Sequence, residues 1–564
     1  MPKVIGIGKQ RYDRIIENDG FYIDKTMFIK EWWENQDDVT LITRPRRFGK
    51  TLNMDMLKCF FSNEYKDRGD LFEGLDIWKK EKYREIQGTY PVIFLSFAKI
   101  KQNTYKDAIA GIKRIICDEI QKYIFLKDWD GLADAEKNNL KNITYGMDDV
   151  TAQEAIASLS NYLSRYYGKN VIILLDEYDT PMQEAYVNGY WEELVSFTRS
   201  FFNATFKSNL YLERAVITGI TRVSKESIFS DLNNLKVITV ESDEYSDTFG
   251  FSEEEVFLAL DDFNLSDKKQ IVKEWYDGFT FGSQRDIYNP WSIINFLENK
   301  KIDTYWADTS SNSLINHLIK KSVPEIKELM ELLLKRESIE VTFDDQIVFN
   351  QLDKSKNAIW SLLVASGYLK IDDIEYKGLL LKPWYHISIT NLETVSMFAN
   401  MFAGWFENPD ARYNDFIKSL LNNDLKGMNY YMNKVALATF SYFDTGKNPS
   451  ETLEPERFYH GFVLGLIVEL SDRYEVKSNR ESGFGRYDVM IIPLDKSEKA
   501  IVLEFKVHEN DEEKTLEETV SSALAQIEEK KYDTELINAG VKKENIRHYG
   551  FAFEGKKVLI GTDE

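Results

Sequence analysis

The sequence predicts an α/β protein built from a parallel sheet with helices on both faces, a mainly helical middle region and a C-terminal domain of αβββαβ order. Three observations predict this class. Short β-branched or aromatic runs alternate with amphipathic helical patterns in the first third. Residues 241–345 have mainly helical patterns, and extended runs return between helical segments in the last third. We expect the three parts to cover residues 1–240, 241–395 and 396–564.

The composition is that of globular domains. The chain has 564 residues, 43% of them hydrophobic, and a net charge of −22. This acidity argues against a generally basic nucleic-acid binder, although it leaves a local basic groove open. The longest apolar runs, such as Val171–Leu175, are far shorter than the roughly 18 residues of a membrane span, so we expect no membrane association. Two cysteines and no visible secretory signal indicate a cytoplasmic protein.

The first part is expected to contain five buried strands. Each run is flanked by turn or polar residues and followed by a helical pattern, which is typical of βαβ units around a parallel sheet. The runs are Val39–Arg44, Pro91–Phe97, Val171–Tyr178, Arg214–Thr221 and Lys236–Val240.

A candidate phosphate loop, RPRRFGKT, follows the first strand and leads into a predicted helix, Leu52–Phe61. It matches the GxxxxGK[ST] pattern at Gly49, Lys50 and Thr51, but Arg44 replaces the first glycine. Gly49 allows backbone N–H groups to approach a phosphate, Lys50 can reach the β- and γ-phosphates, and Thr51 can ligate Mg²⁺. Arg44 would either crowd the nucleotide or contact a phosphate itself. We place the flanking Arg47, Phe48 and Leu52 in the same site; the alternative is a basic surface turn.

Two further strand ends carry polar residues suited to nucleotide chemistry. Asp176 and Glu177 end a buried strand, at the sheet edge where ligands bind. We expect Asp176 to hold Mg²⁺ and Glu177 to polarise the attacking water. Thr218 is the candidate γ-phosphate sensor, and Arg222 would contact the phosphate or a neighbouring subunit. The alternatives are a solvated acidic turn after Glu177 and an exposed arginine at a strand end.

These segments resemble one known family. Phe21–Thr26, Ile42–Asn53 and Leu175–Asp179 are similar to the AAA-ATPase-like family of bacterial proteins, in which RPRRFGKT without the first glycine is the usual pattern. The resemblance implies a P-loop NTPase core that binds ATP over roughly the first 240 residues. P-loop ATPases often form homo-oligomers, and the sequence leaves this open.

The middle region has helical patterns interrupted by loops at Tyr276–Gly278 and Asn289–Pro290. A helix over Ile359–Ser366 precedes short extended pieces up to Thr390. This order suggests a winged-helix-like connector.

The last part predicts an αβββαβ domain with an acidic site. Its elements are a helix at Pro455–Tyr474, extended runs at Glu475–Ser478, Tyr487–Pro493 and Ala500–Val507, a helix at Thr515–Tyr532 and strands around Tyr549–Phe553 and Lys557–Ile560.

Asp488 and Glu504 stand on successive strands joined by a short turn. Their carboxylates, with the Phe505 carbonyl, would form a hard oxygen site for Mg²⁺ or Mn²⁺. Lys506 shares a strand face with Glu504 and can orient or deprotonate the attacking water. Gln526, on the apolar face of the following helix, is a further candidate. The alternative is an inert, ion-paired cluster.

This arrangement resembles the PD-(D/E)xK nuclease superfamily over about Glu451–Ile560, although that superfamily contains inactive members. The resemblance implies a nucleic-acid substrate, with DNA favoured over RNA. The whole sequence therefore predicts an ATPase joined to a metal-dependent nuclease-like domain. One alternative is a signalling ATPase whose C-terminal domain binds without cutting, and another is a nuclease whose P-loop domain is a scaffold.

Overall fold

The structure is a computed structural model, in which the chain forms two compact units. It describes residues 3–221, 228–229, 231–306, 315, 318–319, 324–334, 336–343, 357–406, 413–439, 463, 467, 470, 473–482, 485–508, 514–554 and 557–563. The first unit contains Met1–Ile315 and Ser338–Thr394, and the second contains Asn316–Glu337 and Val395–Glu564.

A five-stranded parallel sheet forms the centre of the first unit, in the order β2-β3-β4-β1-β5. The predicted strands are confirmed, with bounds of Val39–Thr43 (β1), Val92–Ser96 (β2), Val171–Asp176 (β3), Leu212–Gly219 (β4) and Leu235–Ile238 (β5). Every residue of β1 and β3 is buried, because both faces of a parallel sheet are covered.

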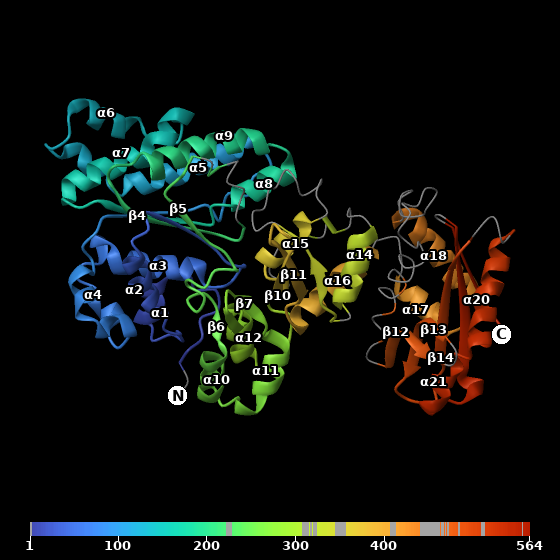
Figure 1. The fold of residues 1–564 in the computed structure, drawn as a ribbon. Coiled ribbons are helices and arrows are strands. Elements are labelled where there is room, and N and C mark those ends of the chain that lie inside the picture. Colours follow the sequence, from blue (N-terminus) through green and yellow to red (C-terminus); the bar gives the residue numbers. More distant parts are fainter. Residues whose placement is uncertain are drawn as a thin grey trace. The chain divides into compact units, whose positions relative to one another are not determined.

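Helices cover both faces of this sheet (Figure 1). One face carries α5, α7 and α9, and the opposite face carries α1 to α4. Their bounds are Tyr12–Glu17 (α1), Met27–Asn35 (α2), Lys50–Phe61 (α3), Glu81–Ile86 (α4), Tyr105–Gln121 (α5), Asp134–Asn142 (α6), Asp149–Tyr167 (α7), Thr180–Asn188 (α8) and Trp191–Phe202 (α9).

The predicted helical region after residue 240 also contains a small antiparallel sheet, which the sequence did not reveal. Its strands are β6 (Phe251–Ser252), β7 (Phe279–Phe281) and β8 (Gln284–Tyr288), in the order β6-β8-β7. Strands of two to five residues are too short for a period-two pattern. Three helices accompany it: α10 (Glu253–Asp262), α11 (Lys269–Tyr276) and α12 (Pro290–Asn299).

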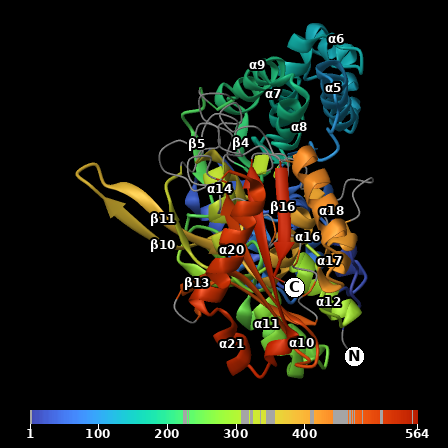
Figure 2. The same cartoon turned by 90° about the vertical axis from the view of Figure 1, so that its right-hand side faces the viewer.

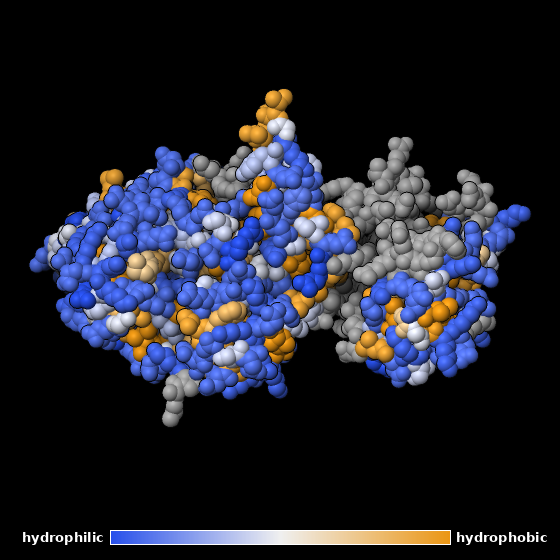
Figure 3. Space-filling view, turned by 60° about the horizontal axis from the view of Figure 1, so that its bottom comes forward, coloured by the Kyte–Doolittle hydropathy of each residue, from blue (hydrophilic) through white to orange (hydrophobic). Residues whose placement is uncertain are grey.

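A long hairpin ends the first unit. Strands β10 (Leu369–Lys377) and β11 (Lys382–Ile389) follow helix α15 (Ala358–Ala365), and β11 also pairs with β9 (Ile339–Val341). The hairpin extends as an arm (Figure 2) and ends in three leucines, Leu379, Leu380 and Leu381. Each leucine is at least 66% exposed, and Figure 3 shows this tip as an orange protrusion.

A mixed five-stranded sheet forms the centre of the second unit, in the order β12-β13-β14-β15-β16. Only β14 and β15 are parallel. The strands span Tyr474–Ser482 (β12), Gly485–Pro493 (β13), Ala500–Val507 (β14), Ile546–Glu554 (β15) and Lys557–Thr562 (β16). The helices include α14 (Pro324–Leu334), α16 (Leu392–Phe406, which begins in the first unit), α17 (Tyr413–Leu421), α18 (Leu425–Thr439), α20 (Leu516–Lys530) and α21 (Asp533–Asn538).

Alternate residues of β13 and β14 enter two different cores. Val489, Ile491 and Leu503 pack with residues of α17 and α18, whereas Met490 and Val502 pack with residues of α20 and α21. The predicted helix at 455–474 lies mostly outside the described residues.

The predicted fold class is confirmed. Within the described part of the chain, no helix is both long enough and apolar enough to cross a bilayer.

Candidate active sites

The loop between β1 and α3 has the backbone of a phosphate-binding turn. Gly49 has a φ of +79° and Arg47 a φ of +65°, so both lie in the left-handed region. A Cβ built on Gly49 would meet no described atom within 4 Å beyond its immediate chain neighbours, so the backbone conformation, and not lack of space, favours glycine. The loop ends at the N-terminus of α3, where free N–H groups favour an anion.

Three predicted side chains meet where α3 begins and where β3 and β4 end. The Thr51 hydroxyl donates a hydrogen bond of 2.8 Å to Asp176 Oδ2, and the Thr218 hydroxyl donates one of 2.7 Å to Asp176 Oδ1. Asp176 is completely buried, and this burial raises the pKa of its carboxyl although both hydroxyls oppose the rise. A carboxylate beside a hydroxyl is a donor set that fits a hard cation such as Mg²⁺.

Lys50 is buried at the centre of the loop. Its ammonium donates hydrogen bonds to the main-chain carbonyls of Arg44 (2.8 Å) and Pro45 (2.7 Å). Burial lowers the pKa of Lys50 to about 8. A phosphate therefore has to compete with the loop's own carbonyls for this ammonium.

Glu177 follows β3 in a left-handed conformation, with a φ of +50°. Its carboxylate accepts a hydrogen bond of 3.1 Å from the Thr180 hydroxyl at the start of α8. Glu177 also lines the cavity beside the phosphate loop.

This cavity has a volume of about 380 Å³, within the size range of small-molecule sites. Its lining includes the phosphate loop, the N-terminal segment between Ile5 and Lys25, the start of α8, and α12. The Arg47 guanidinium lies 4.3 Å from the ring centroid of Trp291 on α12. Among the predicted nucleotide-binding residues, the cavity is lined by Arg47, Phe48, Gly49, Lys50, Thr51 and Leu52.

The predicted phosphate contact of Arg44 is wrong in this structure. The side chain is completely buried and does not line the cavity. Its guanidinium donates hydrogen bonds to main-chain carbonyls, including that of Thr239 at 2.6 Å, and lies 4.6 Å from the ring centroid of Phe281. Buried carbonyls need hydrogen-bond donors, and Arg44 supplies them. Its side chain therefore holds the phosphate loop in place from within the core.

Arg222, the other predicted phosphate contact, lies outside the described residues.

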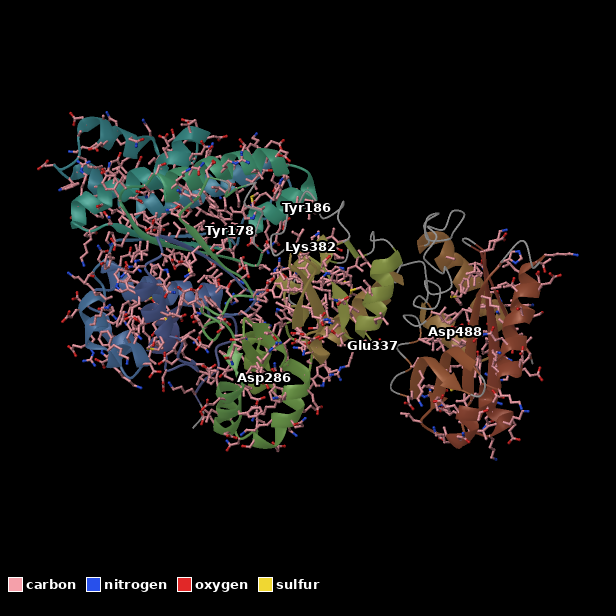
Figure 4. All side chains as sticks on the ribbon, in the orientation of Figure 1. Tyr178, Tyr186, Asp286, Glu337, Lys382 and Asp488 are labelled. Atoms are coloured by element: carbon pink, nitrogen blue, oxygen red, sulfur yellow. The ribbon has the colours of Figure 1, made fainter. Side chains whose placement is uncertain are left out.

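The acidic site of the second unit lies on the sheet face that is covered by α20. Val489 pairs with Leu503, so Asp488 and Glu504 face each other one position further along the antiparallel strands. They share the face of Met490 and Val502, which pack with α20 residues. Asp488 is labelled in Figure 4.

Hydrogen bonds connect the members of this site. The Phe505 N–H donates a hydrogen bond of 2.8 Å to Asp488 Oδ2, and the Gln526 amide of α20 donates one to Glu504 Oε1. Glu504 is only 3% exposed. Lys506 follows Glu504 by two residues on the same face, and it is half-buried. The predicted members from β13, β14 and α20 are therefore brought to one face.

Phe505 contributes differently. Its side chain packs against Phe551 in the opposite core, so only its main chain borders the acidic face. Two carboxylates and a carbonyl again form a donor set that fits Mg²⁺ or Mn²⁺.

Comparisons with known proteins match two parts of the chain. Residues 6–229 match a family model described as "Predicted AAA-ATPase", and residues 454–563 match the PD-(D/E)XK nuclease superfamily. The chain carries one domain of each kind. Both predicted resemblances are thus confirmed.

A relative and a solved structure are also similar to the chain. An uncharacterized protein encoded in the vnfD 5′ region of Azotobacter chroococcum mcd 1 is 24% identical over 504 residues, which cover 87% of each chain. A signal transduction ATPase with numerous domains and a tetratricopeptide repeat sensor, from Pyrococcus horikoshii, is 13% identical with a TM-score of 0.22. The match covers 83% of this chain but only 54% of the solved structure, about half of its length.

Sequence reasoning missed residues in both domains. In the AAA-ATPase-like domain, Trp291 was not predicted to line the cavity, because Asn289–Pro290 indicated only a loop. Asn289 in fact caps α12 and donates a hydrogen bond of 3.3 Å to the Arg46 carbonyl in the phosphate loop.

In the PD-(D/E)XK domain, the missed residue is Tyr532. Its hydroxyl accepts a hydrogen bond of 3.3 Å from Gln526. Burial, followed by the negative charges of Glu504 and Asp488, raises the pKa of Tyr532 to about 12. No pattern in the sequence distinguishes this tyrosine from a core residue.

Proposed function

We propose that the AAA-ATPase-like domain binds and hydrolyses ATP with Mg²⁺. The observation that carries this proposal is the junction of Thr51, Asp176 and Thr218 beside the cavity that Lys50 lines. A buried carboxylate held by two hydroxyls, next to an ammonium and a helix N-terminus, suits a phosphate–metal complex.

Each side chain has a role in this proposal. Lys50 leaves the loop carbonyls and neutralises the β- and γ-phosphates, while Arg47 and the loop N–H groups bind further phosphate oxygens. Thr51 and Asp176 would hold Mg²⁺, which supplies charge against the phosphate oxygens. Glu177 orients and polarises the attacking water. Thr218 senses the γ-phosphate, and its hydrogen bond couples it to Asp176.

The test compares three variants with the wild-type chain. K50A should lose affinity for a fluorescent ATP analogue, whereas D176A should retain most affinity and lose Mg²⁺-dependent phosphate release. Wild-type affinity in K50A would contradict the nucleotide site. E177Q should bind ATP normally and hydrolyse it on the order of 100-fold more slowly, since a general base contributes about this factor.

For the PD-(D/E)XK domain we propose metal-dependent cleavage of nucleic acid, with DNA as the favoured substrate. The supporting observation is the meeting of Asp488 and Glu504 on one face with Gln526 bonded to Glu504. Asp488, Glu504 and the Phe505 carbonyl would hold Mg²⁺ or Mn²⁺. Lys506 then orients the attacking water, and Gln526 fixes Glu504.

Cleavage is tested on single- and double-stranded DNA and RNA with each metal, with and without ATP. D488A should abolish cleavage while circular dichroism shows a folded chain. The second candidate function, a regulatory ATPase whose C-terminal domain binds without cutting, predicts binding of nucleic acid or protein and no cleavage in any condition.

The context of these activities is also part of the proposal. We place the protein in the cytoplasm, because its two cysteines, Cys59 and Cys117, are free and buried. Residues 241–395 would connect ATP binding to the C-terminal domain, and a homo-oligomer is one form in which the ATPase would act. Sedimentation with and without ATP measures the oligomeric state.

A further inference from the structure

None of the roles proposed above uses the carboxylate of Asp179. This residue follows Asp176 by three positions, immediately before α8, and it is completely buried. One of its oxygens, Oδ2, accepts four hydrogen bonds. The donors are the N–H groups of Ile220 (3.0 Å) and Thr221 (2.9 Å), the Thr221 hydroxyl (2.9 Å) and the Gln183 amide (3.1 Å).

These bonds join two segments that carry proposed catalytic groups. Thr221 follows β4, whose end carries Thr218, and Asp179 follows Glu177 by two residues. Tyr178, labelled in Figure 4, reinforces the junction. Its N–H donates a hydrogen bond of 3.0 Å to the Thr218 carbonyl, and its hydroxyl donates one of 2.8 Å to the Thr221 carbonyl.

The same network reaches the phosphate loop at two points. The Arg46 guanidinium donates a hydrogen bond of 3.2 Å to the side-chain oxygen of Gln183, whose amide donates to Asp179. At the other point, the Arg44 N–H donates a hydrogen bond of 3.1 Å to the Gly219 carbonyl at the end of β4. The loop, the end of β4 and the start of α8 thus form one hydrogen-bonded assembly.

Gly219 makes room for this arrangement. A Cβ at this position would lie 2.8 Å from Asp179 Oδ1 and 2.6 Å from the Tyr178 ring. Oδ1 itself has no hydrogen-bond partner in the described part of the chain. A buried carboxylate is costly unless donors compensate it, so the four donors to Oδ2 specify the relative position of their segments.

We infer that Asp179 is a positioning residue for ATP hydrolysis: it fixes the loop after β4 against the start of α8, and so sets Thr218 and Glu177 relative to the γ-phosphate. The inference rests on the proposed ATPase function. Misplacement of catalytic groups by about 1 Å costs on the order of 100-fold in rate. Loss of the carboxylate charge should therefore reduce turnover more than nucleotide affinity.

The experiment uses the full chain, three single variants and the double variant D179N/T221V. D179N keeps the shape and one acceptor but removes the charge, and T221V removes one donor. The matched control is D148N, because the Asp148 carboxylate also accepts hydrogen bonds from a threonine, the Thr151 N–H (2.9 Å) and hydroxyl (2.8 Å), at the exposed N-cap of α7. For each variant, kcat, the Kd for an ATP analogue and the melting temperature are measured with Mg²⁺.

We expect D179N to lower kcat by about 10-fold or more while the Kd stays within about twofold. T221V should lower kcat less than D179N does. The double variant D179N/T221V should lower kcat by a smaller factor than the product of the two single reductions, because the residues act as a pair. D148N should match the wild type in kcat and Kd.

Three outcomes are distinguished. If the wild type hydrolyses ATP and D179N does so equally fast per folded molecule, even at a lower melting temperature, the inference is overturned and the ATPase stands. If the wild type shows no Mg²⁺-dependent turnover, the proposed function fails and takes the inference with it. Should D179N not fold, T221V decides, and an unchanged kcat in T221V overturns the inference.

Discussion

The hydroxyl of Thr51 donates a hydrogen bond of 2.8 Å to the carboxylate of Asp176, although β4 separates the two strands that lead to these residues. Thr218 at the end of β4 donates to the other oxygen of the same carboxylate. The order of the strands therefore places the sensor candidate between the loop and the acidic strand end. Under the proposed function, this preformed hydroxyl–carboxylate pair would leave little reorganisation for cation binding.

The first prediction concerns this pair. T51V removes the hydroxyl but keeps the branched shape, so Mg²⁺-dependent ATP turnover should fall about 10-fold or more. T51S retains a hydroxyl and should stay near the wild-type rate. Phosphate release measured at several Mg²⁺ concentrations checks both variants, and equal rates for T51V and T51S would contradict the assignment of Thr51 as a cation ligand.

The second prediction follows from the buried position of Arg44. R44M fills similar space but leaves several main-chain carbonyls without donors, which should lower the free energy of unfolding by about 1–3 kcal/mol or more. R44K restores one charged donor and should lose less. Thermal melts rank the variants. Since Arg44 does not line the cavity, the folded fraction of R44K should bind the ATP analogue with wild-type affinity, and a large loss of affinity would indicate a phosphate contact.

The third prediction uses the pKa of Lys50, which burial lowers to about 8. Phosphate binding needs the ammonium, so affinity should be constant below pH 7 and decline as pH rises through about 8. The limiting decline is about tenfold per pH unit. K50R keeps its charge over this range and should show a flatter profile. A flat wild-type profile between pH 7 and 9.5 would show that Lys50 stays protonated.

The fourth prediction concerns the acidic site. E504Q keeps the size of the side chain and its contact with Gln526, but it removes one negative charge from the proposed cation site. Calorimetry should show loss of Mn²⁺ binding with little change in melting temperature. A matched control is E498Q, because Glu498 lies in the turn before β14 and pairs with Arg473 at the surface. Mn²⁺ binding that survives in E504Q would contradict the site.

The fifth prediction is a pH dependence of stability in the second unit. His548 lies between Asp533 (2.7 Å) and Asp563 (2.5 Å), and these carboxylates raise its pKa from 6.5 to about 8 against the effect of burial. A raised pKa means that this stabilisation is complete below about pH 6.5 and is lost as pH rises through about 8. The loss is at most about 2 kcal/mol. Calorimetric melts at pH 6 and 9 should show it in the wild type but not in H548Q.

Local patterns predicted the elements whose signals are local. The fully buried run of β3 ends in Asp176, and this combination indicates both a parallel strand and a functional sheet edge. On β14, the period of two places Glu504 and Lys506 on one face. The motif residues around Lys50 were found because their chemistry depends on neighbours in the sequence.

The features that the sequence did not reveal depend on contacts between residues that are far apart in the chain. The carbonyl of Thr239, which holds Arg44 in the core, comes 195 residues later. The loop pattern therefore suggested that Arg44 contacts a phosphate, whereas tertiary packing buries its side chain in the core. Trp291 and Tyr532 reach their sites through tertiary packing of α12 and the end of α20, which no local pattern encodes.

The chain passes from one unit to the other three times, between residues 315 and 316, 337 and 338, and 394 and 395. In the sequence of the second unit, residues 338–394 are an insertion between the segment that contains α14 and residues 395–564. A gene fragment that ends at residue 394 would carry α14 away from the unit to which it belongs. A gene for an intact first unit would instead need residue 315 joined to residue 338, and one for an intact second unit would need residue 337 joined to residue 395.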